Sequence, residues 1–160
     1  MKILVFSDSH GDSLNMRKAI NAHPDADAII FLGDGLGDFF SMPKGISAHL
    51  SVRGNCDWEP MFTHIPKFDS VTLEGNKIVF THGHEYGVKY SMDGIKRLAE
   101  DTSASILLFG HTHKPFEHYE EGVYYFNPGT IGGVYTGEST YGVITIRDNG
   151  ILLSHGKIDN

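Results

Sequence analysis

The sequence predicts an α/β fold in which two β-sheets pack against each other inside flanking helices. The first part of the chain has a β-α-β order, which favours parallel strands with a helix on one face of the sheet. From Phe116 onward, short alternating or apolar runs are separated by glycine-rich turns, a pattern typical of mostly antiparallel strands.

The β-α-β start rests on two apolar runs with a helical segment between them. Residues 3–6 are apolar, rich in β-branched side chains and bounded by polar residues, which predicts a buried strand. Asp12 or Ser13 is placed to cap the helix that follows. Residues 28–32 predict a second buried strand, which ends at Gly33.

The middle of the chain continues this alternation. Residues 46–52 predict a third strand, and residues 71–73 and 78–80 predict a hairpin. Residues 90–99 predict a helix, and residues 106–109 predict another buried strand. Three later strands are expected at residues 123–126, 141–146 and 151–153.

Bulk properties narrow the class of protein. A length of 160 residues predicts one domain over residues 1–160. The formal net charge of −7 argues against an extended nucleic-acid partner. No apolar run approaches the ~20 residues of a membrane span, and the first run is too short for a signal peptide. We therefore expect a cytoplasmic protein with no membrane partner. A strand edge in the second half leaves a homo-oligomer open.

Five short polar motifs each follow a predicted strand. They are Asp8-Ser9-His10, Gly33-Asp34, Gly54-Asn55-Cys56-Asp57, Thr81-His82-Gly83-His84 and Gly110-His111-Thr112-His113. Ligand sites in open α/β sheets gather at the carboxyl ends of strands, so we expect these motifs to converge. Each motif alone is also compatible with an ordinary polar turn or a structural histidine. Their joint occurrence after strands favours a site.

The residue types in these motifs point to metal ions. Two carboxylates, four imidazoles and one amide oxygen suit a transition metal of intermediate softness. A catalytic ion keeps open positions, so seven protein ligands are too many for one ion. Two ions about 3.5–4 Å apart that share a bridging carboxylate fit the number. The candidate ligands are Asp8, His10, Asp34, Asn55, His82, His111 and His113.

The sequence lacks the motifs of two other classes of hydrolase. A haloacid-dehalogenase-type phosphatase needs a second aspartate where this chain has His10. A metallo-β-lactamase-type hydrolase needs His-x-His-x-Asp-His, which residues 111–116 do not supply.

In this order, the motifs resemble those of the calcineurin-like metallophosphoesterases over residues 8–113. Residues 127–130, Asn-Pro-Gly-Thr, resemble an element of the compact YfcE-like phosphodiesterase subfamily, which also has a cysteine after the motif asparagine. The resemblance implies a four-layer αββα sandwich, with two mixed β-sheets flanked by helices and the site at the sheet edge.

The resemblance also implies an assignment of ligands and an activity. The first metal ion would be bound by Asp8, His10 and His113, and the second by Asn55, His82 and His111, with Asp34 as the bridge. The activity would be hydrolysis of a small phosphate ester, most simply a phosphodiester, by a hydroxide that bridges two divalent transition-metal ions. Manganese is the first choice, with nickel, iron, cobalt or zinc as alternatives.

Four residues are candidates for catalysis beside the ions: Asn55, Cys56, Asp57 and His84. The Asn55 amide would stabilise charge on the phosphate. Many superfamily members have a histidine at position 56 as general acid, oriented by the acidic residue that follows. Cys56 therefore predicts weak help for poor leaving groups, unless it is only a small buried filler. His84 either faces the substrate or has a supporting or surface role.

A non-enzymatic alternative is a protein-binding scaffold of the same fold, as in the retromer subunit. That subunit departs from the metal pattern, whereas all seven ligand positions are intact in this chain. This difference favours the enzyme.

Overall fold

The computed structural model describes residues 1–42 and 48–159, in which the strands form two five-stranded sheets. The first sheet has the order β10 (Gly150–Ile158), β9 (Ser139–Arg147), β1 (Lys2–Phe6), β2 (Ala28–Phe31) and β3 (Ala48–Ser51). The second has the order β4 (Phe68–Leu73), β5 (Asn76–Thr81), β6 (Ile106–Leu108), β8 (Val123–Pro128) and β7 (Pro115–Glu120). Each sheet combines parallel and antiparallel pairs, so both are mixed.

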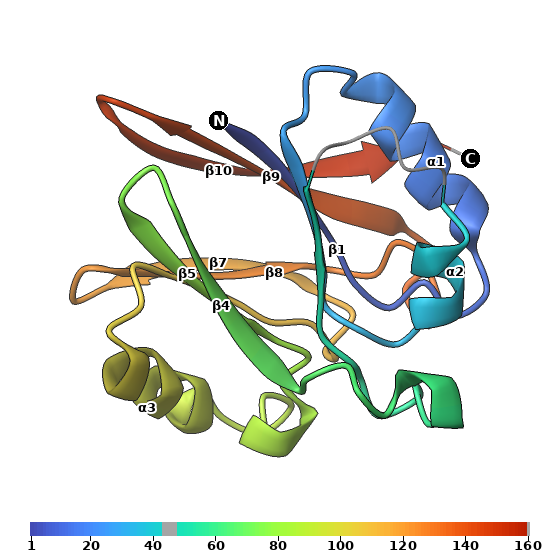
Figure 1. The fold of residues 1–160 in the computed structure, drawn as a ribbon, viewed down its shortest axis with the longest axis horizontal. Helices are drawn as coiled ribbons and strands as arrows, with labels where there is room; N and C mark the ends of the chain where they lie inside the picture. Colours follow the sequence, from blue (N-terminus) through green and yellow to red (C-terminus); the bar gives the residue numbers. More distant parts are fainter. Residues whose placement is uncertain (43–47, 160) are drawn as a thin grey trace.

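Helices cover the outer faces of the two sheets (Figure 1). Helices α1 (Ser13–Ala22) and α2 (Leu36–Phe40) lie on the first sheet, and α3 (Asp93–Thr102) lies on the second. Two short 3₁₀ turns are η1 (Pro60–Phe62) and η2 (His84–Tyr86). This arrangement confirms the four-layer αββα sandwich. Within the described residues, no helix is long and apolar enough to cross a membrane.

Strand β1 shows how the sequence produces the layers. Its side chains alternate between two cores, because successive residues of a strand point to opposite faces. Ile3 and Val5 pack between the two sheets, whereas Leu4 and Phe6 pack under α1 and α2. Both faces are covered, so residues 3–6 are all fully buried, and this explains the continuous apolar run.

The structure refines several predicted boundaries. The Asp12 side chain caps α1 by accepting hydrogen bonds from the backbone N–H groups of residues 14 and 15. Helix α3 begins at Asp93 rather than at residue 90. Of the strand predicted at 46–52, residues 46 and 47 lie outside the described residues, and β3 covers Ala48–Ser51. Strand β8 pairs in parallel with β6, within the half expected to be mostly antiparallel.

Apart from the two 3₁₀ turns, two elements had no prediction. Strand β7 is an edge strand whose side chains are almost all exposed, so it lacks an apolar pattern. Helix α2 has five residues, too few for a helical period to be visible.

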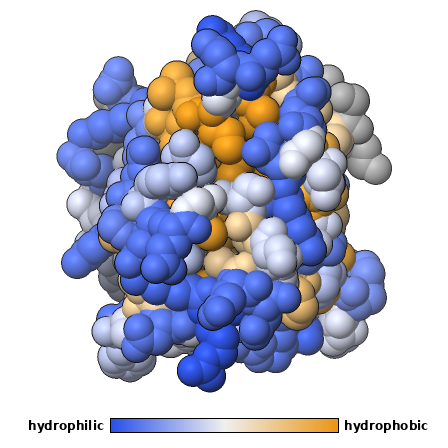
Figure 2. Space-filling view, turned by 90° about the vertical axis from the view of Figure 1, so that its left-hand side faces the viewer, coloured by the Kyte–Doolittle hydropathy of each residue, from blue (hydrophilic) through white to orange (hydrophobic). Residues whose placement is uncertain are grey.

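A hollow lies at the amino-terminal end of β1. Figure 2 shows apolar surface gathered on the side of the molecule that it draws. The hollow is lined by both apolar and polar residues, among them Met1, Ile146, Ile151, Arg147 and Asp148. It lies at the opposite end of β1 from the polar motifs, which follow the carboxyl ends of the strands.

Candidate metal centre

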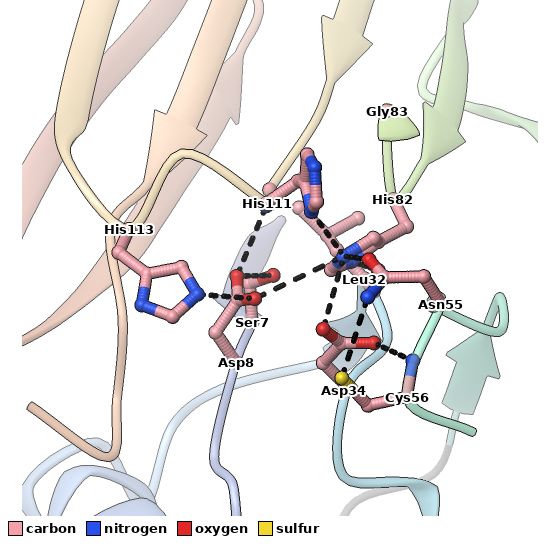
Figure 3. Close-up of polar contacts among 12 residues, drawn as sticks. Ser7, Asp8, Leu32, Asp34, Asn55, Cys56, His82, Gly83, His111 and His113 are labelled. Carbon is pink, nitrogen blue, oxygen red and sulfur yellow. Dashed lines mark hydrogen bonds and ion pairs between the residues drawn. The ribbon is translucent and has the colours of Figure 1, made fainter. Parts of the chain in front are cut away.

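The polar motifs meet where the carboxyl ends of strands from both sheets come together (Figure 3). The loops after β1, β2 and β3 approach from the first sheet, and those after β5 and β6 approach from the second. The motifs therefore converge in the structure, as predicted.

Backbone strain is concentrated in these loops. Nine non-glycine residues of the described chain have a positive φ. Five of them are predicted ligands: Asp8, His10, Asp34, His111 and His113. A left-handed conformation costs a non-glycine residue about 1–2 kcal/mol, so the surrounding structure holds these side chains in place against a local cost.

A first group of donor atoms comes from Asp8, His10 and His113, with all three atoms within 4.8 Å of one another. His113 Nε2 lies 3.1 Å and His10 Nε2 lies 3.7 Å from Asp8 Oδ1. This oxygen is buried and has no hydrogen-bond partner among the described residues. The other oxygen, Oδ2, accepts the backbone N–H of His111 at 3.1 Å. One face of the Asp8 carboxylate is thus left for a cation.

A second group comes from Asp34, His82 and His111. His82 Nε2 lies 3.3 Å from Asp34 Oδ2 and 3.2 Å from His111 Nδ1. The Asn55 side-chain oxygen is 3.2 Å from the same nitrogen. Asp34 Oδ2 is also 3.9 Å from His10 Nε2, so this carboxylate stands between the two groups.

The tautomer of His82 shows why a cation fits here. Its Nδ1 lies 2.9 Å from the carbonyl oxygen of Leu32, which can only accept, so Nδ1 carries the hydrogen. In the neutral ring Nε2 then presents a lone pair to the oxygens of Asp34 and Asn55. His113 follows the same rule, with Nδ1 3.1 Å from the carbonyl oxygen of Val134. Metal-binding histidines almost always donate their other N–H in this way.

The pKa shifts in the metal-free chain also indicate a site that favours a cation. Burial opposes ionisation of Asp8, but the imidazoles of His10 and His113 beside its Oδ1 atom hold the pKa of its carboxyl well below the usual range. Burial likewise opposes a charge on His82, yet Asp34 and Asp8 raise the pKa of this imidazole. The Asp8 carboxylate raises the pKa of His113. Protons on these imidazoles take the place of a cation, so metal binding must displace them.

His111 differs from its neighbours. Burial and the charge of His82 lower the pKa of its imidazole to about 4, so the ring stays neutral and its lone pair remains available. The donor set of both groups, imidazole nitrogen with carboxylate and amide oxygen, suits divalent transition metals.

Cys56 is exposed, so the interpretation of this residue as a small buried filler is wrong. Its sulfur lies within 4.8 Å of donor atoms of His10 and Asp34. Partial burial of the sulfur and the neighbouring Asp34 carboxylate raise the pKa of the thiol to about 11.

Asp57 has other partners than the resemblance suggested. Its buried carboxylate accepts four backbone N–H groups, those of Asp34, Gly35, Leu36 and Gly54, at 2.7–2.9 Å. The resemblance implies that this carboxylate orients the side chain at position 56, but in the structure it binds these backbone N–H groups instead. Asp57 ties the loop that carries Asp34 to the loop that carries Asn55.

His84 lies beside the second group without belonging to it. Its ring centroid is 5.4 Å from that of His82 and 6.0 Å from that of His111. Its Nδ1 is buried and has no hydrogen-bond partner among the described residues. Burial and the charge of His82 lower the pKa of this imidazole. A neutral ring next to the cluster can face a bound phosphate ester.

Several supporting residues had no predicted role. Asp38 accepts hydrogen bonds from Ser9 Oγ at 2.6 Å and the Gly11 N–H at 2.8 Å, which holds the loop after β1. Asn127 donates to the Gly110 carbonyl at 2.9 Å and to Thr112 Oγ1 at 3.0 Å, which holds the loop of His111 and His113. The Asn-Pro-Gly-Thr element signalled Asn127, but no sequence signal distinguished Asp38.

Comparison with known proteins assigns the chain to a family. Residues 1–149 match the model of the calcineurin-like phosphoesterase superfamily domain, so the chain belongs to this family. Phosphodiesterase YfcE of Escherichia coli is 30% identical over 182 residues, which cover 100% of this chain and 88% of that protein.

Solved structures agree on the fold. A predicted phosphoesterase from Streptococcus pneumoniae superposes with a TM-score of 0.77 at 28% identity, covering 98% of this chain and 88% of that one. Vps29 from Chaetomium thermophilum superposes with a TM-score of 0.80 at 18% identity, covering 99% and 95% of the two chains. The second comparison shows the fold alone.

Proposed function

We propose that this protein is a phosphodiesterase that uses two divalent transition-metal ions, manganese in the first instance. The observation that carries the proposal is the pair of donor groups that share Asp34. One group contains a buried carboxylate oxygen of Asp8 without a hydrogen bond. The other brings His82 Nε2 within 3.3 Å of three further acceptor atoms, those of Asp34, Asn55 and His111. The similarity to YfcE supports the choice of a diester as substrate.

In this proposal, Asp8, His10 and His113 bind one ion, Asn55, His82 and His111 bind the other, and Asp34 bridges them. Two bound divalent cations supply an activated water nucleophile near neutral pH and offset the charge of the phosphate. The protein holds the donors in place through strained loops and backbone hydrogen bonds, so little reorganisation is needed when the ester binds. In this proposal the Asn55 amide and the neutral His84 ring would contact phosphate oxygens.

Metal content tests the proposal directly. We expect protein purified without chelator and saturated with Mn²⁺ to bind two ions per chain, because each donor group satisfies one ion. Elemental analysis after removal of free metal measures the number, and hydrolysis of bis(p-nitrophenyl) phosphate measures the activity. A saturating stoichiometry of one would refute the binuclear centre. Protein without metal or turnover would support the scaffold alternative.

Cys56→His tests whether the side chain at position 56 affects proton transfer to the leaving group. A placed general acid contributes about 10²–10⁴-fold to rate, and its ideal pKa lies near the working pH. In the metal-free chain the thiol has a pKa of about 11, and next to two bound cations it would instead ionise, so in neither state does it donate a proton readily near neutral pH. The wild-type enzyme should therefore prefer diesters with good leaving groups. The imidazole should raise kcat/KM for an alkyl leaving group more than for p-nitrophenol. Cys56→Ser, which also lacks a group titrating near neutrality, is the matched control. Equal changes for both leaving groups would exclude a role for this position in proton transfer.

The remaining features stay proposals from the sequence. They are the single domain over residues 1–160, the cytoplasmic location and a possible homo-oligomer.

A further inference from the structure

A cavity of about 670 Å³ opens beside the metal centre, between the loop before α3 and the loop that joins β6 to β7. Its lining includes the buried side chains of Val88 and Phe109 and the exposed side chain of Phe116. Thr112, which lies between the proposed ligands His111 and His113, is part of the same wall. A volume of this size with a mostly apolar lining and a few polar groups is typical of a small-molecule site.

The cavity is joined to both histidine loops. Phe109 immediately precedes the loop of His111, and its ring centroid is 5.9 Å from that of Phe116. Val88 packs so close to Gly83, between His82 and His84, that a Cβ on this glycine would come within 3.0 Å of it. A ligand that contacts the proposed metal ions therefore has this cavity as its neighbour.

Two lysines at the cavity lack acidic partners. Within the described part of the chain, Lys89 and Lys114 form no ion pair, whereas Lys2, Lys67, Lys96 and Lys157 each pair with a carboxylate. Unpaired cations beside an apolar cavity favour a ligand that is both apolar and anionic.

We propose that this cavity binds an alcohol substituent of the phosphate ester, and that it selects an aromatic group that carries its own negative charge. The ring would lie against Phe116, and the added charge would face Lys89 and Lys114. The inference rests on the proposed function, because it places the phosphate at the metal centre.

Binding of phosphonates, which are not hydrolysed, tests the inference independently of turnover. The probes are 4-carboxyphenylphosphonate and methylphosphonate, titrated calorimetrically into Mn²⁺-loaded protein. We expect the aryl compound to bind about tenfold or more tightly, the difference that one aromatic contact and one favourable charge make. Phe116→Ala and Lys89→Gln should each lower this preference about threefold and leave methylphosphonate binding within about twofold.

Matched variants separate the cavity from general effects. Tyr119→Ala removes an exposed ring from the same strand, β7. Lys77→Gln removes a lysine at the amino end of β5 that forms no ion pair with any residue the structure describes. Both should keep the preference for the aryl compound. Equal affinity of the wild type for the two phosphonates, or equal loss of both in the cavity variants, would overturn the inference. Intact preference without hydrolysis of any diester would instead count against the proposed function alone.

Discussion

Asp34→Asn is expected to lower kcat for a diester on the order of 10²–10³-fold, the range that loss of one transition-state electrostatic contact costs. The Asp34 carboxylate stands between the two donor groups, 3.3 Å from His82 Nε2 and 3.9 Å from His10 Nε2. An amide has no negative charge to share between two cations. Activity should therefore fall even where metal is supplied in excess.

The fold should tolerate this change. Asp34 Oδ1 accepts the Cys56 N–H at 2.7 Å, and the oxygen of an asparagine can keep this bond. In the metal-free chain the substitution removes the attraction between Asp34 and the His82 imidazole, which outweighs burial and the repulsion from Asp8 and holds the pKa of Asp34 below its usual value. We expect the metal-free variant to fold but to unfold at a somewhat lower temperature than the wild type.

Three measurements make this prediction decisive: kcat, bound metal per chain and thermal unfolding without metal. Asp38→Asn is the matched control, because it neutralises a carboxylate that holds the loop after β1 without belonging to either donor group. Its effect on kcat should be smaller than that of Asp34→Asn. Near-wild-type turnover by Asp34→Asn with two ions bound would remove Asp34 from the bridge.

The sequence was sufficient for the fold class and for the residues that gather at the site. Residues 3–6 and 28–32 are apolar because both faces of their strands are covered, and such runs are visible without a structure. The motifs after them carry donor side chains, and the topology of parallel strands brings these together. The family resemblance then supplied the proposed assignment of the ligands to two metal ions.

Other features depend on contacts that a sequence does not display. Cys56 was open to a buried interpretation because a cysteine after a turn has no pattern of its own. Strand β7 was missed because an exposed edge strand needs no apolar period. The cavity beside Phe116 depends on how two distant loops approach each other, and neither loop alone indicates it.

Asp57 is the clearest case of a residue whose type was noted and whose contacts were not foreseen. A Gly-Asn-x-Asp motif gives no sign that the last carboxylate accepts backbone N–H groups from a loop more than twenty residues earlier. The structure shows the carboxylate 4% exposed, with Oδ1 facing Gly35 and Leu36 and Oδ2 facing Asp34 and Gly54.

Asp57→Asn should consequently lower the free energy of unfolding by about 2–5 kcal/mol, because an asparagine offers only one oxygen and turns an N–H₂ group toward two buried N–H donors. Each buried donor left without an acceptor costs about 1–3 kcal/mol. The loss should persist in the metal-free protein, since these bonds connect loops and contact no proposed ion. Urea unfolding of the chelated protein measures it.

Asp69→Asn serves as the control for Asp57→Asn, because Asp69 is an exposed carboxylate on β4, where a surface substitution changes stability by no more than about 0.5 kcal/mol.

The bonds of Asp57 also set the distance between the loops of Asp34 and Asn55. An Asp57→Asn variant that still folds should therefore bind the ion of the second donor group more weakly. Metal titration at a temperature well below unfolding separates this effect from the loss of stability. Unfolding free energy within about 1 kcal/mol of the wild type would show that water or a relaxed loop replaces the carboxylate, since that is less than the cost of one unsatisfied donor. Asp57 would then not be the residue that holds the two loops together.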